Sequence, residues 1–153
     1  MPSDRSKKDV YFEDIETGVT YETPSRTITL PELNAFLALT EDDHPIHHDT
    51  DYVKRLGFNA PLVPGVFTMS LLTGLEPKLG WNKYVALLGV VEASFRQPIH
   101  VGDSIRAAVE VLDKRYTTDR KRGILTIKHI VLNQRDEHVA TFVRRSMMEA
   151  RGT

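Results

Sequence analysis

The sequence contains no cysteine among its 153 residues. This absence excludes disulfide bonds, catalysis by a thiolate and zinc sites built on cysteine ligands. A chain that uses no disulfide suits a reducing compartment, so we expect a cytoplasmic location.

An excess of charge of one sign and long apolar runs are also missing. The formal net charge at pH 7 is -1, which gives no reason to expect nucleic acid or an anionic membrane as a partner. No apolar run approaches the ~18 residues that a membrane-spanning helix needs. The start of the chain is polar and lacks the apolar segment of a secretory signal, so we expect residues 1–10 to form a flexible tail.

What is present is the composition of an ordinary folded domain. Hydrophobic residues make up 41% of the chain and charged residues 27%, a balance that supports a core without cross-links. The length suits one domain, and the sequence shows no internal repeat. We therefore expect a single domain over residues 11–150.

The first half of the chain predicts short elements separated by polar loops. Residues 26–30 alternate like a short strand. Thr29 and Glu32 have the spacing of a capping box, which predicts a helix over residues 31–39.

A polar loop is expected next, over residues 40–48, because Pro45 disfavours helical geometry before it and donates no hydrogen bond. Asp49 then suits the cap of a short helix, and Gly57 suits its end.

The second half predicts one apolar helix and a sheet. Residues 65–79 are apolar on more than one face, which is typical of a helix surrounded by protein. Four strand-like runs follow, separated by turn residues. They are Tyr84–Phe95, Ser104–Tyr116, Gly123–Asn133 and His138–Met148. Long antiparallel strands curve, and a curved sheet buries its apolar face by wrapping a helix. The predicted fold class is therefore α+β.

The loop before Asp49 carries the residues best suited to chemistry. Asp42 and His47 lie five positions apart around a proline turn and are able to converge on one water molecule. A histidine exchanges protons near neutral pH because its free pKa is ~6.5. Two other interpretations stay open, namely plain helix capping and a metal site, although the spacing matches no zinc pattern such as H-E-x-x-H. We expect no metal.

The step from Pro64 to Gly65 opens the apolar helix. A helix start presents unpaired N–H groups and the positive end of the helix dipole. Glycine also lets a ligand approach the backbone closely. This position suits the oxygen of a thioester carbonyl that gains negative charge, and the competing interpretation is an ordinary helix start after proline.

Taken together, several segments resemble the MaoC-like dehydratases, the family of (R)-specific enoyl-CoA hydratases with the hot-dog fold. The resemblance runs from about Phe12 to Met148. Four segments carry it, namely E-D-D-H-P-I-H at residues 41–47, Y-V-K-R-L-G-F at residues 52–58, F-R-Q-P-I at residues 95–99 and V-G-D-S-I at residues 101–105.

The resemblance implies roles for particular residues. Asp42 and His47 would hold one water and pass its protons during addition across the C2–C3 double bond of an enoyl thioester. The N–H of Gly65 would bind the thioester carbonyl. The substrate would be an acyl-coenzyme A or an acyl carrier protein thioester, with no cofactor beyond the coenzyme A of the substrate. The chain would form a homodimer, or a dimer-based oligomer, by joining sheets.

Two departures from the family pattern keep alternatives open. His44 stands where the family usually has asparagine, and Pro64 stands where it commonly has histidine. We keep both positions as candidates for substrate binding. An acyl-CoA thioesterase and a non-catalytic partner subunit of a heterodimeric dehydratase are the alternative functions. Phe67, Met69 and Leu72 are candidates to line an acyl pocket, core packing being their other role, and a branched or dicarboxylic acyl group stays open.

Overall fold

The computed structural model describes residues 8–152. Most of the predicted flexible tail, residues 1–7, lies outside the described residues. No helix within the described range combines the length and apolarity needed to cross a membrane. The elements are η1 (Phe12–Asp14), β1 (Thr20–Glu22), β2 (Arg26–Thr27), α1 (Leu30–Thr40), η2 (Pro45–His47), α2 (Thr50–Arg55), α3 (Gly65–Leu75), η3 (Glu76–Leu79), β3 (Tyr84–Phe95), β4 (Ser104–Tyr116), β5 (Arg122–Leu132) and β6 (His138–Glu149).

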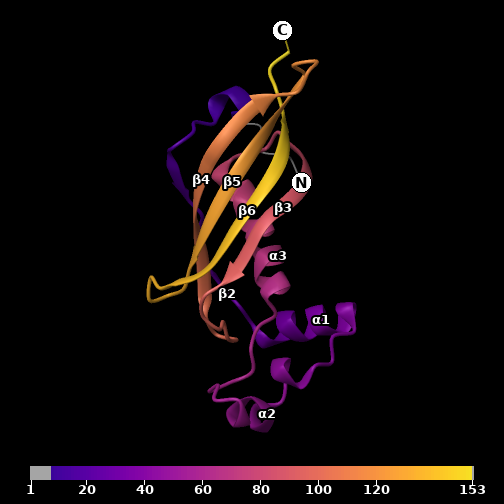
Figure 1. Ribbon diagram of the computed structural model, residues 1–153, viewed down its shortest axis with the longest axis vertical. Coiled ribbons are helices and arrows are strands. Elements are labelled where there is room, and N and C mark those ends of the chain that lie inside the picture. The colour runs from indigo at the N-terminus through magenta and orange to yellow at the C-terminus, as the bar shows by residue number, and fades with distance from the viewer. Residues whose placement is uncertain (1–7, 153) are drawn as a thin grey trace.

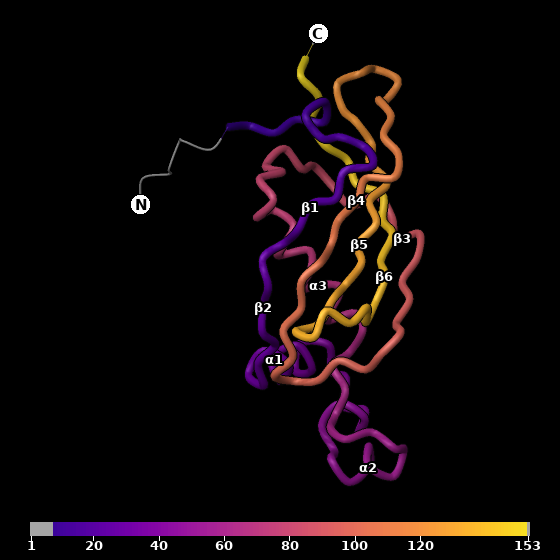
Figure 2. The backbone as a smooth tube through the Cα atoms, turned by 90° about the vertical axis from the view of Figure 1, so that its left-hand side faces the viewer, coloured from indigo at the N-terminus to yellow at the C-terminus, as the bar shows by residue number. Residues whose placement is uncertain are grey.

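A curved antiparallel sheet forms the body of the molecule, in the strand order β1-β4-β5-β6-β3, with β2 paired to β4. Figures 1 and 2 show α3 lying along one face of this sheet, and α1 and α2 beyond one end of the strands. Alternate residues of β4 and β5 are buried, as a sheet with one covered face requires. The predicted α+β fold, a curved sheet around an apolar helix, is confirmed.

The helix α3 is shorter than the sequence predicted. The α-helix ends at Leu75, and residues 76–79 continue as the 3-10 helix η3. Pro77 is the physical reason, since proline has no N–H to donate to the carbonyl four residues earlier. The inward face of α3 is buried, with Leu75 at 1% exposure, whereas Val66 on the other side is 58% exposed.

The smaller elements follow the predicted pattern with shifted ends. Glu32 accepts hydrogen bonds from the N–H and the hydroxyl of Thr29, which confirms the capping box of α1. Hydrogen bonds from Thr29 and Arg26 lower the pKa of Glu32 to about 2. The strand predicted over residues 26–30 is only two residues long because Leu30 already belongs to α1. The short strand β1 was not predicted.

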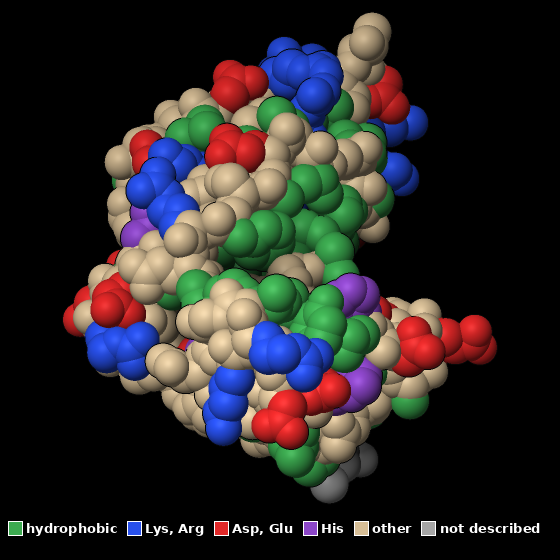
Figure 3. All heavy atoms as spheres, turned by 60° about the horizontal axis from the view of Figure 1, so that its bottom comes forward, with side chains coloured by type: hydrophobic (Ala, Val, Ile, Leu, Met, Phe, Trp, Pro, Cys, Tyr) green, Lys and Arg blue, Asp and Glu red, His purple; other side chains and the backbone are tan. Residues whose placement is uncertain are grey.

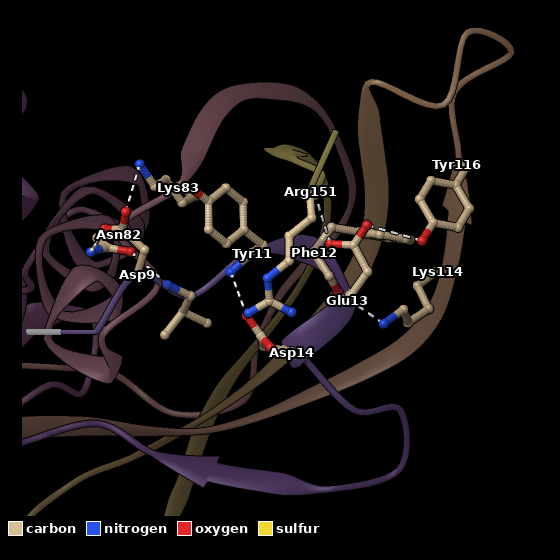
Figure 4. A network of polar contacts seen from close by, with 11 residues as sticks. Asp9, Tyr11, Phe12, Glu13, Asp14, Asn82, Lys83, Lys114, Tyr116 and Arg151 are labelled. Carbon is tan, nitrogen blue, oxygen red and sulfur yellow. Dashed lines mark hydrogen bonds and ion pairs between the residues drawn. The ribbon is translucent and has the colours of Figure 1, made fainter. Parts of the chain in front are cut away.

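The beginning and the end of the described chain are tied to the body of the domain (Figure 4). Asp9 pairs with Lys83 at 3.2 Å, and Arg151 pairs with Asp14 at 2.6 Å. The ammonium group of Lys114 donates to the carbonyl oxygens of Phe12 and Ile15 at 2.9 and 2.7 Å. The segment before β1 therefore belongs to the domain.

Phe12 packs so closely on β5 that it requires glycine at position 123. A Cβ placed on Gly123 would lie 1.9 Å from a ring carbon of Phe12, which is itself buried at 2% exposure. We expect Gly123→Ala to lower the free energy of unfolding by about 1–3 kcal/mol through overpacking, measured by denaturant titration. Gly89→Ala in β3 is the matched control, because its Cβ would meet nothing within 4 Å. Equal losses in the two variants would contradict this reading of the contact.

Candidate active site

The carboxylate of Asp42 is held where the chain leaves α1. Glu41 ends the helix in the left-handed conformation, with φ at 56°. The N–H of Asp42 then donates to the carbonyl of Leu37 at 3.1 Å, and its Oδ1 accepts from the N–H of His44 at 3.3 Å. These bonds fix the carboxylate at the loop while leaving its side chain 38% exposed.

The imidazole of His47 is oriented by a backbone carbonyl far along the chain. Its Nδ1 lies 2.7 Å from the oxygen of Leu62. Because a carbonyl only accepts, Nδ1 carries the proton and Nε2 becomes the nitrogen that exchanges one. That Nε2 lies 3.5 Å from Oδ2 of Asp42, and the His47 side chain is only 15% exposed. The two predicted catalytic side chains therefore face each other.

The segment that contains Leu62 links this loop to the start of α3. The N–H of Leu62 donates to the carbonyl of Ile46 at 2.9 Å, and the N–H of Val63 donates to Ile99 at 2.7 Å. Two residues later the chain enters α3. These backbone hydrogen bonds thus fix the position of His47 relative to the start of α3.

Gly65 is the first residue of α3, so its N–H has no acceptor within the helix. A Cβ at this position would lie 2.3 to 2.8 Å from three ring carbons of Phe95. Only glycine lets this aromatic ring lie against the helix start. The carbonyl of Pro64 accepts from the N–H groups of Phe67 and Thr68 at 3.0 and 3.1 Å.

A cavity of about 370 Å³ brings together two of the predicted residues, His47 and Gly65. Asp42 contacts His47 from outside this lining and lies in a separate depression beside the end of α1. Figure 3 shows apolar side chains in a hollow of the surface, with histidine side chains near its rim. The cavity is lined by His47, Phe58, Leu62, Val63, Gly65, Thr68, Phe95, Arg96, Gln97, Pro98 and Ile99. It thus combines an imidazole, a backbone N–H without an acceptor among the described residues, and an apolar wall.

The arrangement agrees with the comparison to protein families. The family model for the MaoC like domain matches residues 13–133. The chain belongs to the MaoC-like domain family.

Known proteins resemble this MaoC-like domain in sequence and in fold. The (R)-specific enoyl-CoA hydratase of Aeromonas caviae is 37% identical over 87 residues, which are 57% of this chain and 64% of that protein. The X-ray structure of a monoamine oxidase regulatory protein from Archaeoglobus fulgius superposes with a TM-score of 0.85 at 30% identity, covering 94% of this chain and 97% of that one. A Mycobacterium tuberculosis protein with a double hot-dog fold superposes with a TM-score of 0.83 at 21% identity, covering 94% and 45%.

These comparisons confirm the hot-dog fold and the family that the sequence resembled. The MaoC-like domain spans between 33% and 64% of the length of the first curated relatives that it matches.

The structure places the other predicted positions of the MaoC-like domain outside the cavity lining. Nδ1 of His44 accepts from the N–H of Ile46 at 3.2 Å, and its ring lies edge-on to Tyr52 at 5.9 Å. Pro64 contributes its carbonyl to the first turn of α3. Within residues 8–152, no group of three or more potential ligands is placed to hold a metal ion. Substrate contacts by His44 and Pro64 stay predictions.

Sequence reasoning missed several contacts of this cavity. Leu62 acts through its carbonyl, for which a side-chain pattern gives no signal. Phe95 stood in the matched F-R-Q-P-I segment, so a role was signalled without its contact to Gly65. The hydroxyl of Thr68 is fully buried and has no hydrogen-bond partner among the described residues.

Proposed function

We propose that this MaoC-like domain catalyses the reversible hydration of the C2–C3 double bond of an enoyl thioester, giving the (R)-3-hydroxyacyl thioester. The observation that carries the proposal is the pairing of Nε2 of His47 with Asp42, beside the free N–H of Gly65. The (R)-specific enoyl-CoA hydratase among its relatives supports the same reaction.

The proposed chemistry needs these three groups for distinct tasks. The N–H of Gly65 stabilises the carbonyl oxygen as negative charge develops on it, which makes C3 electrophilic. Asp42 and Nε2 of His47 hold the water. One of them accepts its proton as the C3–O bond forms, and this proton then passes to C2, so the pair returns to its starting protonation state. The atoms of one water molecule are thereby added, with no redox step. We propose that no cofactor beyond the coenzyme A of the substrate is needed, and a cytoplasmic location stays a prediction.

The direct test is hydration of crotonyl-CoA, followed by the loss of absorbance of the conjugated thioester, with chiral analysis of the product. Formation of the (R)-3-hydroxy product is the expected result. Release of free coenzyme A from a saturated acyl-CoA would instead identify a thioesterase. Binding of acyl-CoA esters without turnover would identify the non-catalytic partner subunit of a dehydratase.

We also propose that the chain forms a homodimer through β3. Within the described residues, β3 pairs with β6 alone, so its other edge is free. Exposed apolar side chains follow this strand, and a free apolar edge is a natural pairing surface. They include Val85, Leu87, Leu88, Val90 and Val91.

A charge on this strand is expected to separate the dimer. We expect Val91→Lys, at a position 54% exposed in the single chain, to shift the protein from dimer to monomer in light scattering coupled to size exclusion. Leu39→Lys on α1, at a position 83% exposed, is the control and should leave the mass unchanged. A Val91→Lys protein that remains dimeric would place the interface elsewhere.

A further inference from the structure

Three cavities follow one another along a single face of α3. The cavity at Gly65 also meets Thr68, a second of about 180 Å³ meets Leu72 and Thr73, and a third of about 370 Å³ meets Thr73 and Glu76. Gly65, Thr68 and Leu72 are three and four residues apart, which is the spacing of one helix face, and Thr73 borders that face. Glu76 follows at the start of η3. A rise of 1.5 Å per residue puts Thr73 about 12 Å along the axis from Gly65.

The second and third cavities adjoin, because they share Thr73, Leu87 and Arg144. The first cavity shares no lining residue with the second, and Phe95 of the first meets Phe142 of the second edge to face at 5.5 Å. An acyl chain whose thioester lies at Gly65 would pass these two rings to reach the second and third cavities along α3.

The far end of this path is polar, although its surroundings are apolar. Glu76 from η3, His129 from β5, and Arg144 and Ser146 from β6 are at most 8% exposed. Glu76 contacts the guanidinium of Arg144, and its Oε1 lies 3.5 Å from Nε2 of His129. These residues, which line the second and third cavities, are called the polar cluster below.

The polar cluster retains unused hydrogen-bonding capacity. Nε of Arg144, Nδ1 of His129, Oε1 of Glu76 and the hydroxyl of Ser146 are buried and have no hydrogen-bond partner within residues 8–152. Buried polar groups are normally satisfied, because leaving a buried donor or acceptor without a partner destabilises the fold. Unpaired atoms beside a cavity therefore point to a bound polar group.

We propose that the polar cluster binds a hydroxyl group on the distal part of the acyl chain, so that the preferred substrates are hydroxylated enoyl thioesters of medium length. This inference rests on the proposed hydratase function, because it places the thioester at Gly65.

The charges of the cluster favour a neutral ligand. The carboxylate of Glu76 already balances the guanidinium of Arg144, whose pKa burial lowers only to about 10. Burial also lowers the pKa of His129 to about 4, so the ring is neutral at pH 7. A ligand carboxylate would add an uncompensated buried charge, and a plain alkyl end would leave the polar atoms unsatisfied.

A hydroxyl matches the free atoms of the cluster. Nε of Arg144 is a donor, which a hydroxyl oxygen accepts. The neutral ring of His129 carries one proton, so its Nδ1 either donates or accepts, and a hydroxyl matches both roles. A hydroxyl both accepts and donates, whereas a carboxylate only accepts.

The test compares binding of decanoyl-CoA with binding of its ω-hydroxy and ω-carboxy analogues by calorimetry. These saturated esters need no turnover, so crotonyl-CoA hydration tests the proposed function separately. We expect the ω-hydroxy ester to bind roughly 10- to 100-fold more tightly than the other two. Equal affinities would overturn the inference and leave the cluster as a site for buried water, and tightest binding of the ω-carboxy ester would overturn the preference for a neutral group.

Substitutions in the polar cluster test whether it causes the preference for the ω-hydroxy ester. We expect Ser146→Ala, a mild change, to reduce the preference for the hydroxyl by about three- to tenfold. The paired variant Glu76→Leu with Arg144→Met replaces both ions by apolar side chains and should abolish the preference. Arg135→Met removes an exposed ion pair with Glu137 and is the matched control that should keep it. A preference that survives in the paired variant would place the hydroxyl elsewhere.

Discussion

A glutamine in place of His47 is expected to reduce the hydration of an enoyl-CoA by about 100- to 10,000-fold, the usual contribution of a general acid or base. Glutamine fills a similar volume and is able to donate to the carbonyl of Leu62, as Nδ1 does at 2.7 Å. It does not exchange protons near neutral pH. Initial rates of absorbance loss measure the effect, and circular dichroism shows whether the fold is retained.

Asp42→Asn is expected to cause a loss of the same order. Its amide preserves the shape of the carboxylate but accepts no proton, so the proposed activation of water by the pair would be lost. His48→Gln is the matched control from the same loop, because the ring of His48 is exposed and bonds to the carbonyl of Asp43 at 2.8 Å. Near-normal turnover in either Asp42→Asn or His47→Gln would refute the assignment of that residue.

The second large effect concerns stability. Arg144→Met alone is expected to lower the free energy of unfolding by about 3–5 kcal/mol, because it leaves the carboxylate of Glu76 buried without its partner. Glu76 is only 6% exposed, so water compensates little of that charge. Denaturant titration at neutral pH measures the loss.

The paired variant separates charge from packing. Adding Glu76→Leu to Arg144→Met removes the unpaired charge and should recover most of the lost free energy, since apolar replacements of a buried ion pair are often neutral or stabilising. A paired variant as unstable as the single one would mean that the loss comes from packing around β6 and not from the buried carboxylate.

Part of the candidate site could be predicted from the sequence. The pairing of Asp42 with His47 followed from five-residue spacing around Pro45, and the structure places the two side chains 3.5 Å apart. The helix start at Gly65 was also correct. The end of that helix was not, although Pro77 gave the signal. The sequence analysis did not point to Glu76 or Arg144, because nothing local shows that these two distant charges are buried and meet.

The sequence by itself determined the elements of this protein and the residue types available for chemistry. Capping at Thr29, the proline turn at Pro45 and the alternation along β4 depend on dihedral preferences and side-chain periodicity, which act over a few residues. These local preferences also yielded the α+β class, because a curved apolar sheet and an apolar helix bury each other.

Only the tertiary structure decided which distant groups meet. The carbonyl of Leu62 selects the tautomer of His47, the ring of Phe95 covers Gly65, and Glu76 pairs with Arg144. Each contact depends on strand register and on the seating of α3 against the sheet, where a shift of one residue in a strand would turn its side chains to the other face. Register and packing result from all contacts of the chain together, so no local pattern encodes them.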